Sequence, residues 1–379
     1  MEQRKLGTAI KIIKDKNKNQ HSYRAFSISN IKGFIAQDEQ FGKDNTYSKT
    51  DKSTNYIVKP GMFAYNPARI NVGSIAYQNQ TEPVLVSSLY EIFQTNSKID
   101  DSFLMNWFKT SLFNRQIKRL EEGGVRQYFF IDKMKETEIK LPSISEQNQI
   151  SKLLQLVNKN LDLQQRKLEL LSLIKKTIIK HLFKLKNSDS LNLKFKTSCS
   201  QWNSKKLGEI AKFINGRAFK QSELLNKGKY PVLRVGNFYT NDKWFYSDLN
   251  LNKNKYADKG DLLYTWSATF GPHIWKGSKV IFHYHIWKID FDPSTVNKTF
   301  LFYFLEADKE NLLTNSNGST MIHITKSNME NKIINLPQFS IQQNIGTFLS
   351  NLDYLINQVK IKSKQLIQLK RFLLQNMFI

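Results

Sequence analysis

The sequence is poor in cysteine, in acidic residues and in long apolar runs. Cys199 is the only cysteine among 379 residues, which excludes an internal disulfide and a cysteine-based zinc site. No stretch approaches the roughly 20 uninterrupted apolar residues that a membrane-spanning helix needs. The segment from Met1 to Gln20 also lacks a hydrophobic signal core. We therefore expect a cytoplasmic protein that does not bind a membrane.

Positive charge dominates the composition. The chain has 57 Lys+Arg against 32 Asp+Glu, a formal net charge of +25. This balance suits a polyanionic partner, and nucleic acid is the first candidate. With 40% hydrophobic and 12% aromatic residues, the chain has enough apolar material for two or three packed domains.

The sequence contains an internal repeat. Residues 123–183 align without a gap on residues 318–378, each pair lying 195 positions apart. The fronts of the two halves also correspond, because Lys5-Leu6-Gly7 matches Lys206-Leu207-Gly208. A period this long indicates two whole domains rather than a solenoid of small repeats.

Each repeat is predicted to end in a long helix. Ser143 and Glu146 have capping-box spacing, and the 39 residues from Ser145 to Phe183 would span roughly 58 Å. Apolar positions step by three and four, a seam that predicts a helix pair and a surface for partners. Its residues are Ile150, Leu154, Val157, Leu161, Leu168 and Leu171 in the first helix, and Ile345, Leu349, Leu352, Ile356, Val359 and Leu366 in the second. The alternative, a membrane-surface or calmodulin-type amphipathic helix, is disfavoured because the seam is narrow and occurs twice.

The segments before the helices predict strands and turns. Residues 56–94 and 230–291 contain short alternating runs, of which Val280 to Trp287 is predicted as one strand. The fold class is therefore α/β (α+β): two domains repeated about a pseudo-twofold axis and separated by two long antiparallel coiled-coil helices. The predicted segments are a first domain 1–142, a helix 143–186, a linker 187–204, a second domain 205–337 and a helix 338–379.

In this order, the repeated features resemble the specificity subunit of type I restriction-modification systems. The resemblance covers nearly the whole chain. Two features depart from it: Ile341 stands where the family usually has Glu, and the sequence begins almost directly at Lys5-Leu6-Gly7. It rests on Leu141-Pro142 with Glu146-Gln147, Leu336-Pro337 with Gln342-Gln343, the Lys-Lys-Leu-Gly start at Lys205, and the segment from Asn66 to Ile75.

The resemblance implies a non-catalytic protein with two target-recognition domains. Each domain would read one half of a bipartite target in double-stranded DNA. The helices would dock two methyltransferase subunits and, through them, restriction-translocase subunits. S-adenosylmethionine, ATP and Mg²⁺ would be bound by those partners, and no cofactor or metal by this chain.

Motifs for catalysis are weak or missing. The chain has no Gly-x-x-x-x-Gly-Lys-Ser/Thr phosphate loop, and Asn66-Pro67 lacks the second Pro and the aromatic residue of the amino-methyltransferase motif. Glu138-Ile139-Lys140 fits a nuclease Glu-x-Lys, but no suitably placed Pro-Asp precedes it. Two alternatives stay open: a stand-alone DNA-modifying enzyme, either a methyltransferase or a nuclease, and a structural coiled-coil adaptor.

Base reading favours Arg, Asn, Gln and Lys side chains. His273, His283 and His285 are candidates for a metal site, although a packed or DNA-facing strand is the preferred interpretation. Trp266, Trp275 and Trp287 are assigned to the core. The predicted DNA contacts are Arg69, Asn71, Arg126 and Gln127 in the first domain, and Arg217, Lys220, Arg234, Asn237 and His273 in the second.

Overall fold

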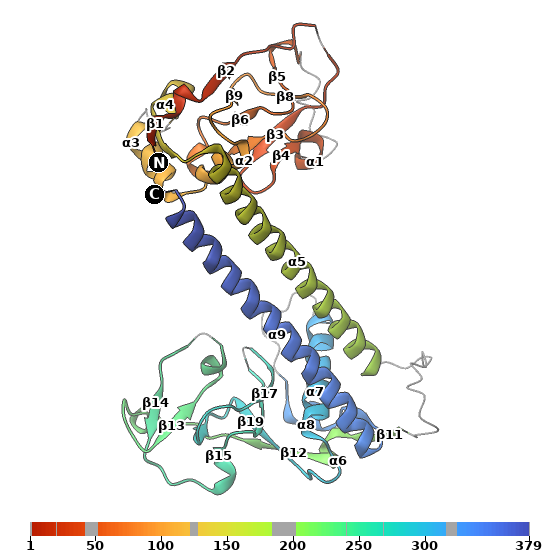
Figure 1. Ribbon diagram of the computed structural model, residues 1–379. Helices are drawn as coiled ribbons and strands as arrows, with labels where there is room; N and C mark the ends of the chain where they lie inside the picture. The colour runs from red at the N-terminus through yellow and green to blue at the C-terminus, as the bar shows by residue number, and fades with distance from the viewer. Residues whose placement is uncertain are drawn as a thin grey trace. The chain divides into compact units, whose positions relative to one another are not determined.

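The computed structural model describes the chain except residues 1, 20, 42–51, 122–127, 184–201, 240, 268, 316–323 and 379. The chain forms two units, Met1–Gln165 with Ile361–Ile379, and Arg166–Lys360. Both boundaries fall inside the long helices α5 (Ile144–Leu182) and α9 (Phe339–Asn376), labelled in Figure 1. Each unit therefore holds one α/β domain, the beginning of the helix that follows it and the end of the other helix. Along the chain, helix α5 leads from the first unit to the second and α9 leads back to the first.

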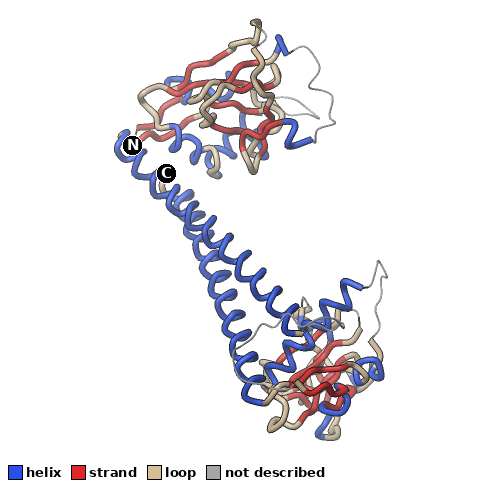
Figure 2. The backbone as a smooth tube through the Cα atoms, turned by 90° about the vertical axis from the view of Figure 1, so that its right-hand side faces the viewer, coloured by secondary structure: helices blue, strands red, loops and turns tan. Residues whose placement is uncertain are grey.

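The first domain is built on an antiparallel sheet of four strands in the order β2-β9-β6-β7. Phe63 and Phe93 lie opposite each other on β6 and β9, and their rings stack with centroids 5.0 Å apart. Both rings are fully buried in the core. The strands are β1 (Glu2–Lys5), β2 (Ile10–Ile13), β3 (Phe26–Ser29), β4 (Gly33–Ala36), β5 (Tyr56–Val58), β6 (Phe63–Tyr65), β7 (Ile75–Tyr77), β8 (Val84–Val86), β9 (Glu91–Thr95) and β10 (Glu138–Leu141). The helices are α1 (Gln37–Phe41), α2 (Asp101–Trp107), α3 (Ser111–Leu120) and α4 (Ile131–Glu136), and Figure 2 colours helices blue and strands red.

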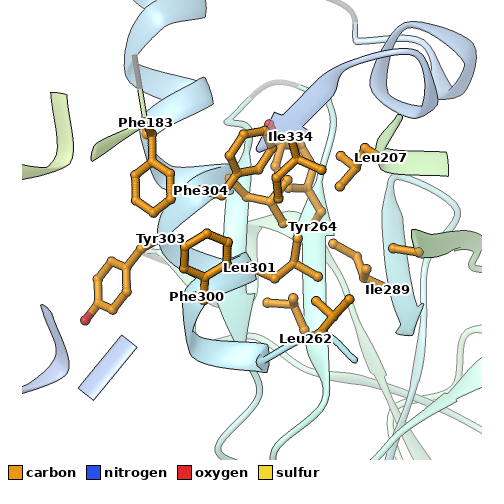
Figure 3. Close-up of a cluster of buried hydrophobic side chains, with 14 of the residues drawn as sticks. Phe183, Leu207, Leu262, Tyr264, Ile289, Phe300, Leu301, Tyr303, Phe304 and Ile334 are labelled. Carbon is orange, nitrogen blue, oxygen red and sulfur yellow. The ribbon is translucent and has the colours of Figure 1, made fainter. Parts of the chain in front are cut away.

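The second domain repeats this plan in the sheet β12-β19-β16-β17. Figure 3 shows its core, where Phe300, Leu301 and Phe304 meet side chains of the sheet. A second sheet, β14-β13-β18-β15, occupies the region where the described part of the first domain has the pairs β3-β4 and β5-β8. The strands are β11 (Asn203–Lys206), β12 (Ala211–Asn215), β13 (Tyr230–Leu233), β14 (Phe245–Ser247), β15 (Tyr256–Ala257), β16 (Leu262–Thr265), β17 (Gly271–Ile274), β18 (Val280–Phe282), β19 (Ile286–Phe291) and β20 (Ile333–Leu336). The helices are α6 (Leu207–Ile210), α7 (Lys298–Asn315) and α8 (Lys326–Glu330).

The Leu-Gly pair at the front of each half makes the same contacts in both units. The Leu6 amide donates to the Thr137 carbonyl at 2.8 Å, and the Leu207 amide donates to the Lys332 carbonyl at 2.7 Å. A Cβ atom added at Gly7 or at Gly208 would lie 2.9 Å from the Cβ of the residue packed on it. Glycine is therefore needed at both positions because the end of a helix, α4 in the first unit and α8 in the second, approaches the backbone.

Helix α5 begins with the predicted capping box. The Ser143 amide donates to Glu146 Oε2 at 2.9 Å, and the Glu146 amide donates to Ser143 Oγ at 3.3 Å. These reciprocal bonds satisfy amide groups that the helix itself leaves without partners.

A buried glutamine fastens the start of each long helix to its domain. Gln147 accepts a hydrogen bond from the Asp100 amide at 2.8 Å and donates to the carbonyls of Lys98 and Pro142 at 3.2 and 3.0 Å. Gln342, 195 positions later, makes the corresponding three bonds in the second unit. The repeated glutamine of the sequence is thus a structural link between helix and domain.

The predicted seam residues all lie on the covered side of their helices. Phe183, at the end of α5, packs on Phe300 with ring centroids 5.3 Å apart, and Phe378, after α9, packs on Phe103 at 4.8 Å. Each helix is thus anchored to a domain at both of its ends, while the role of the seam in binding partners stays a prediction. Buried seam residues are Leu154, Val157, Ile345, Leu349, Leu352, Ile356 and Val359, and half-buried ones are Ile150, Leu161, Leu168, Leu171 and Leu366.

One predicted strand is wrong. The run from Val280 to Trp287 is divided by a turn, in which the Ile286 amide donates to the His283 carbonyl at 2.9 Å. Strand β18 pairs with β13 and β15, whereas β19 pairs with β12 and β16, so the chain changes sheets at this turn. The alternation of the sequence is real in each strand, but it does not reveal the crossing between sheets. Of the predicted linker 187–204, residues 187–201 lie outside the described residues, and β11 begins at Asn203.

Candidate nucleic-acid interface

Four strands of the second domain end at one edge. The register places Asn215 of β12 opposite Trp287, Thr265 of β16 opposite Ile286, and Leu233 of β13 beside Phe282 of β18. The segments that follow these strands therefore meet there. We call their side chains the recognition edge: Arg217, Arg234, Trp266, His283, Tyr284 and His285.

Backbone hydrogen bonds join the segments of the recognition edge. The Arg217 amide donates to the Phe282 carbonyl at 3.0 Å, and the Tyr284 amide donates to the Arg217 carbonyl at 3.0 Å. The indole of Trp266 donates to the Tyr284 carbonyl at 2.9 Å. A Cβ at Gly216 would lie 2.3 Å from two carbonyl oxygens, so only glycine fits beside this turn. The edge is consequently a set of side chains held in place from several strands, as precise recognition requires.

The two arginines of the recognition edge differ in how their charge is balanced. Arg217 Nη2 forms an ion pair with Glu223 Oε1 at 2.6 Å. The Arg234 guanidinium lies over the Phe245 ring at 4.3 Å, and within the described part of the chain it has no carboxylate partner. Its Nε is buried and makes no hydrogen bond. A half-buried cation without a partner is costly, and an incoming acceptor would relieve that cost.

The histidine beside Arg234 is neutral at physiological pH. Burial, then the charges of His285 and Arg234, lower the pKa of His283 to about 4. A neutral imidazole offers one donor and one acceptor, and it adds no repulsion to the neighbouring guanidinium. Together, His283 and Arg234 present hydrogen-bonding groups of both kinds at an edge that includes the exposed ring of Tyr284.

A second aromatic group surrounds His273 on β17. Its ring stacks on Phe238 with centroids 4.0 Å apart, and its Nε2 lies 3.2 Å from Tyr239 Oη and 3.4 Å from Thr265 Oγ1. Burial, followed by the charge of Lys309, lowers its pKa to about 4. His273 is therefore a packed, neutral residue that positions the exposed Tyr239, and its own contact with DNA stays a prediction.

Two other predicted contacts of the second domain, Asn237 and Lys220, form hydrogen bonds within their own loops. Asn237 accepts from the Arg234 amide at 3.0 Å and donates to the carbonyls of Asn241 and Lys243. Its amide is thus occupied in shaping the loop that carries Arg234. The Lys220 amide donates to Glu223 Oε2 at 2.8 Å, and its side chain is exposed.

The first domain has a groove of about 680 Å³ that is rich in amide side chains. The predicted contact Asn71 lines it, and Asp101 is its acidic residue, accepting a hydrogen bond from Thr95 Oγ1. Burial, then the hydrogen bond to Asp101, raise the pKa of Tyr77 in the wall to about 12, so its hydroxyl keeps its proton. Amides read base edges and lysines contact phosphates. Its other polar residues of these kinds are Asn30, Lys32, Asn79, Gln80, Lys109 and Asn114.

The other predicted contacts of the first domain lie beside this groove or outside the described residues. Arg69 is exposed, and its carbonyl accepts hydrogen bonds from the amides of Val72 and Ser74. Gly73 closes this loop with a φ of 90°, a conformation that favours glycine. Arg126 and Gln127 lie outside the described residues.

Several residues of these surfaces were not predicted from the sequence as DNA contacts. Tyr284 and Trp266 were not predicted as contacts, because the split of the strand at His283 was not foreseen. The groove residues come from two loops, Asn30 from the one after β3 and both Asn79 and Gln80 from the one after β7. A usable signal was their position: polar residues directly after short strands are the ones that loops can bring together.

Neither a metal centre nor a membrane helix is found where the structure describes the chain. Outside the gaps named above, no group of three or more His, Cys, Asp or Glu residues has the arrangement of a metal site. Over the same residues, no helix has the length and hydropathy to cross a bilayer. Among the weighed tryptophans, Trp287 is buried, whereas Trp266 and Trp275 are partly exposed.

The chain thus contains one α/β domain twice, and basic and amide side chains gather on loops of each copy. A family model described as the type I restriction modification DNA specificity domain matches residues 5–173 and 199–370. The chain therefore belongs to this family and carries its domain twice. The predicted resemblance and the predicted fold class, two repeated domains with two long helices, are confirmed.

Curated relatives carry the same description. The chain is 24% identical over 173 residues to the type I restriction enzyme EcoBI specificity subunit of Escherichia coli, covering 45% of this chain and 36% of that protein. It is 26% identical over 180 residues to the MjaVIII specificity subunit of Methanocaldococcus jannaschii, covering 47% and 42%. The matched part thus spans less than half of either relative. The putative MjaX specificity subunit of the same organism is 24% identical over 341 residues, covering 85% of this chain and 78% of that protein.

Solved structures share the fold. The HsdS subunit from Thermoanaerobacter tengcongensis matches with a TM-score of 0.55 and 16% identity, covering 98% of this chain and 95% of that chain. The S subunit of a type I restriction-modification system from M. genitalium matches with a TM-score of 0.58 and 15% identity, covering 100% and 96%. At this level of identity the likeness concerns the fold.

Proposed function

We propose that this chain is a DNA-specificity subunit whose two domains each read one half of a split target. The observation that carries the proposal is the occurrence of the family's domain in both repeats. The net charge of +25 supports a DNA partner, and the polar loop surface in each domain offers a place for base contacts. The chain acts without catalytic chemistry of its own, in the cytoplasm where chromosomal DNA is accessible.

In the second domain, Arg234 is the leading candidate for direct base reading. An arginine fork matches the O6 and N7 acceptors of guanine, and each such pair contributes roughly 1–3 kcal/mol of discrimination. The unpaired guanidinium is held over Phe245, so little side-chain freedom is lost on binding. In the first domain, Asn71 in the groove and Arg69 beside it are the corresponding candidates.

The long helices are proposed to dock two methyltransferase subunits, which in turn bring restriction-translocase subunits. Both helices carry large apolar side chains on their exposed faces. Helix faces that contact only water seldom carry many such side chains, so these faces support a protein partner. S-adenosylmethionine, ATP and Mg²⁺ are assigned to those partner subunits. The exposed apolar residues include Leu153, Leu156, Leu163, Leu170 and Leu173 on α5, and Phe348, Leu355, Ile367, Leu369 and Phe372 on α9.

Paired arginine variants test the division of labour between the domains. We expect Arg69→Ala and Arg234→Ala to lower affinity about 5- to 150-fold each, the equivalent of 1–3 kcal/mol, and to relax base preference in different half-sites. Binding is measured by the purified complex on a library of DNA duplexes with every base substituted in turn. Arg166→Ala, at an exposed position of α5, is the matched control.

Three outcomes separate the alternatives. Equal loss of preference at both half-sites contradicts independent domains. Binding without any base preference favours the structural adaptor. Methyl transfer or cleavage by the isolated chain favours the stand-alone enzyme.

A further inference from the structure

The two units carry different charges at one set of equivalent positions of the repeat. In the second unit, Lys175 Nζ lies 2.7 Å from Asp353 Oδ1 and 3.2 Å from Glu306 Oε2. Tyr303 Oη donates to Asp353 Oδ2 at 2.6 Å. This lysine is fully balanced by carboxylates of the same unit. Burial lowers its pKa, but its bond to Asp353 and the charge of Glu306 outweigh that effect, and the pKa is raised overall.

The corresponding residues of the first unit follow from the repeat. The positions 195 residues from Lys175 and Asp353 are Lys370 and Asn158. Helices α2 and α7 correspond at a spacing of 197, because Asp100 and Asn297 cap them and both donate an amide to the buried glutamine. By the same spacing, Lys109, in the turn after α2, is the counterpart of Glu306 in α7.

The first unit thus has two lysines and an amide, Lys370, Lys109 and Asn158, at these positions. The second unit has one lysine and two carboxylates there. The correspondence with the ion pair of Lys175 and Glu306 places Lys109 near Lys370. In agreement with this, burial and then the charge of Lys370 lower the pKa of Lys109. Neither lysine has an ion pair among the described residues. Lys109 also lines the groove of the first domain, beside amide side chains and Lys32. The like charges are therefore placed at a surface that a ligand can reach.

We propose that Lys109 and Lys370 hold a DNA backbone phosphate in the first unit only, whereas the second unit neutralises the equivalent position with its own carboxylates. A phosphate between the two ammonium groups removes their repulsion and forms charge-assisted hydrogen bonds. The amides of the same groove favour DNA over an acidic protein as the source of the anion, since they match base edges. This inference rests on the proposed DNA-reading function, and it makes the two half-sites unequal in their dependence on salt.

The test rebuilds the second unit's charges in the first. Lys109→Glu combined with Asn158→Asp supplies carboxylates where Glu306 and Asp353 stand in the other unit. We expect the slope of log affinity against log salt concentration to fall in magnitude by about 1, since one phosphate contact contributes about 0.9. Affinity at low salt should fall for cognate and unrelated DNA alike. The thermal unfolding temperature should stay the same or rise, because an ion-pair network replaces a repulsion.

Three further variants keep the result interpretable. Lys109→Met and Lys370→Gln, which each remove one of the two charges on the phosphate, should each lower the magnitude of the slope, by less than the double variant does. Lys362→Glu, at an exposed position of α9, has the same charge change as Lys109→Glu. It should alter the slope by less than Lys109→Met or Lys370→Gln does. All are measured in the complex with the methyltransferase subunits, on duplexes of target and scrambled sequence.

The failures are distinguishable. If the wild-type complex shows no base preference, the proposed function fails. If it reads its target and the lysine variants keep the wild-type slope, only the phosphate site fails. Affinity lost equally at every salt concentration, with a lower unfolding temperature, indicates a structural role for Lys109 and also overturns the site.

Discussion

Replacing Gln342 by Met should destabilise the second unit in a predictable way. Its side chain makes three hydrogen bonds, accepting from the Asn297 amide at 2.9 Å and donating to the carbonyls of Thr295 and Pro337 at 3.2 and 3.0 Å. Methionine has nearly the same length but makes none of them. At a net value of about 1 kcal/mol per bond, and with buried partners left unsatisfied, the unfolding free energy should fall by about 3 kcal/mol.

Urea unfolding followed by tryptophan fluorescence measures this loss where it occurs. The second unit holds Trp202, Trp244, Trp266, Trp275 and Trp287, whereas Trp107 is in the first. With an m-value of roughly 2–3 kcal/mol per molar for a domain of this size, the midpoint should fall by about 1 M. Gln343→Met, at the exposed neighbouring position, should leave it nearly unchanged. A shift below about 0.3 M, or one equal to that of Gln343→Met, would refute the anchoring role.

Three more substitutions test other parts of the structure. In the folded protein, His273 has a pKa of about 4 against an ordinary 6.5, so the unfolded chain binds this proton at a higher pH. The free energy of unfolding should therefore fall as the pH drops from 6.5 towards 4. In urea titrations, His273→Gln should reduce this dependence on pH. Gly216→Ala forces a Cβ to within 2.3 Å of two carbonyl oxygens, and it should cost about 3 kcal/mol or more by the same assay. Leu349→Ala should cost about 2–5 kcal/mol, and exposed Leu355→Ala under about 0.5; similar losses in both would contradict the packing.

Local and repeated features of the chain were predictable from the sequence. The long helix was expected from Ser145 to Phe183 and runs from Ile144 to Leu182, because its cap and its apolar spacing are both local signals. The repeat was visible because matched residues keep the same spacing, and the structure gives those residues matched hydrogen bonds.

Non-local features were not predictable in the same way. The turn at His283 depends on bonds to Arg217 and Leu233, which are 66 and 50 positions away in the chain. The side-chain amide of Asn237 donates to the Asn241 and Lys243 carbonyls of its own loop, which its residue type did not reveal, and its contact with DNA stays a prediction. Residue type indicates what a side chain can bind, whereas its neighbours decide what it does bind.

We propose that this chain supplies the DNA sequence preference of a methyltransferase. The most direct test is to map methylated adenines across a genome in cells that express the methyltransferase subunit with the chain, without it, and with its Arg234→Ala variant. We expect a split motif around the methylated adenines that appears only with the chain. With the Arg234→Ala variant, one half of this motif should lose its base preference. An unchanged methylation pattern in the absence of the chain would contradict it.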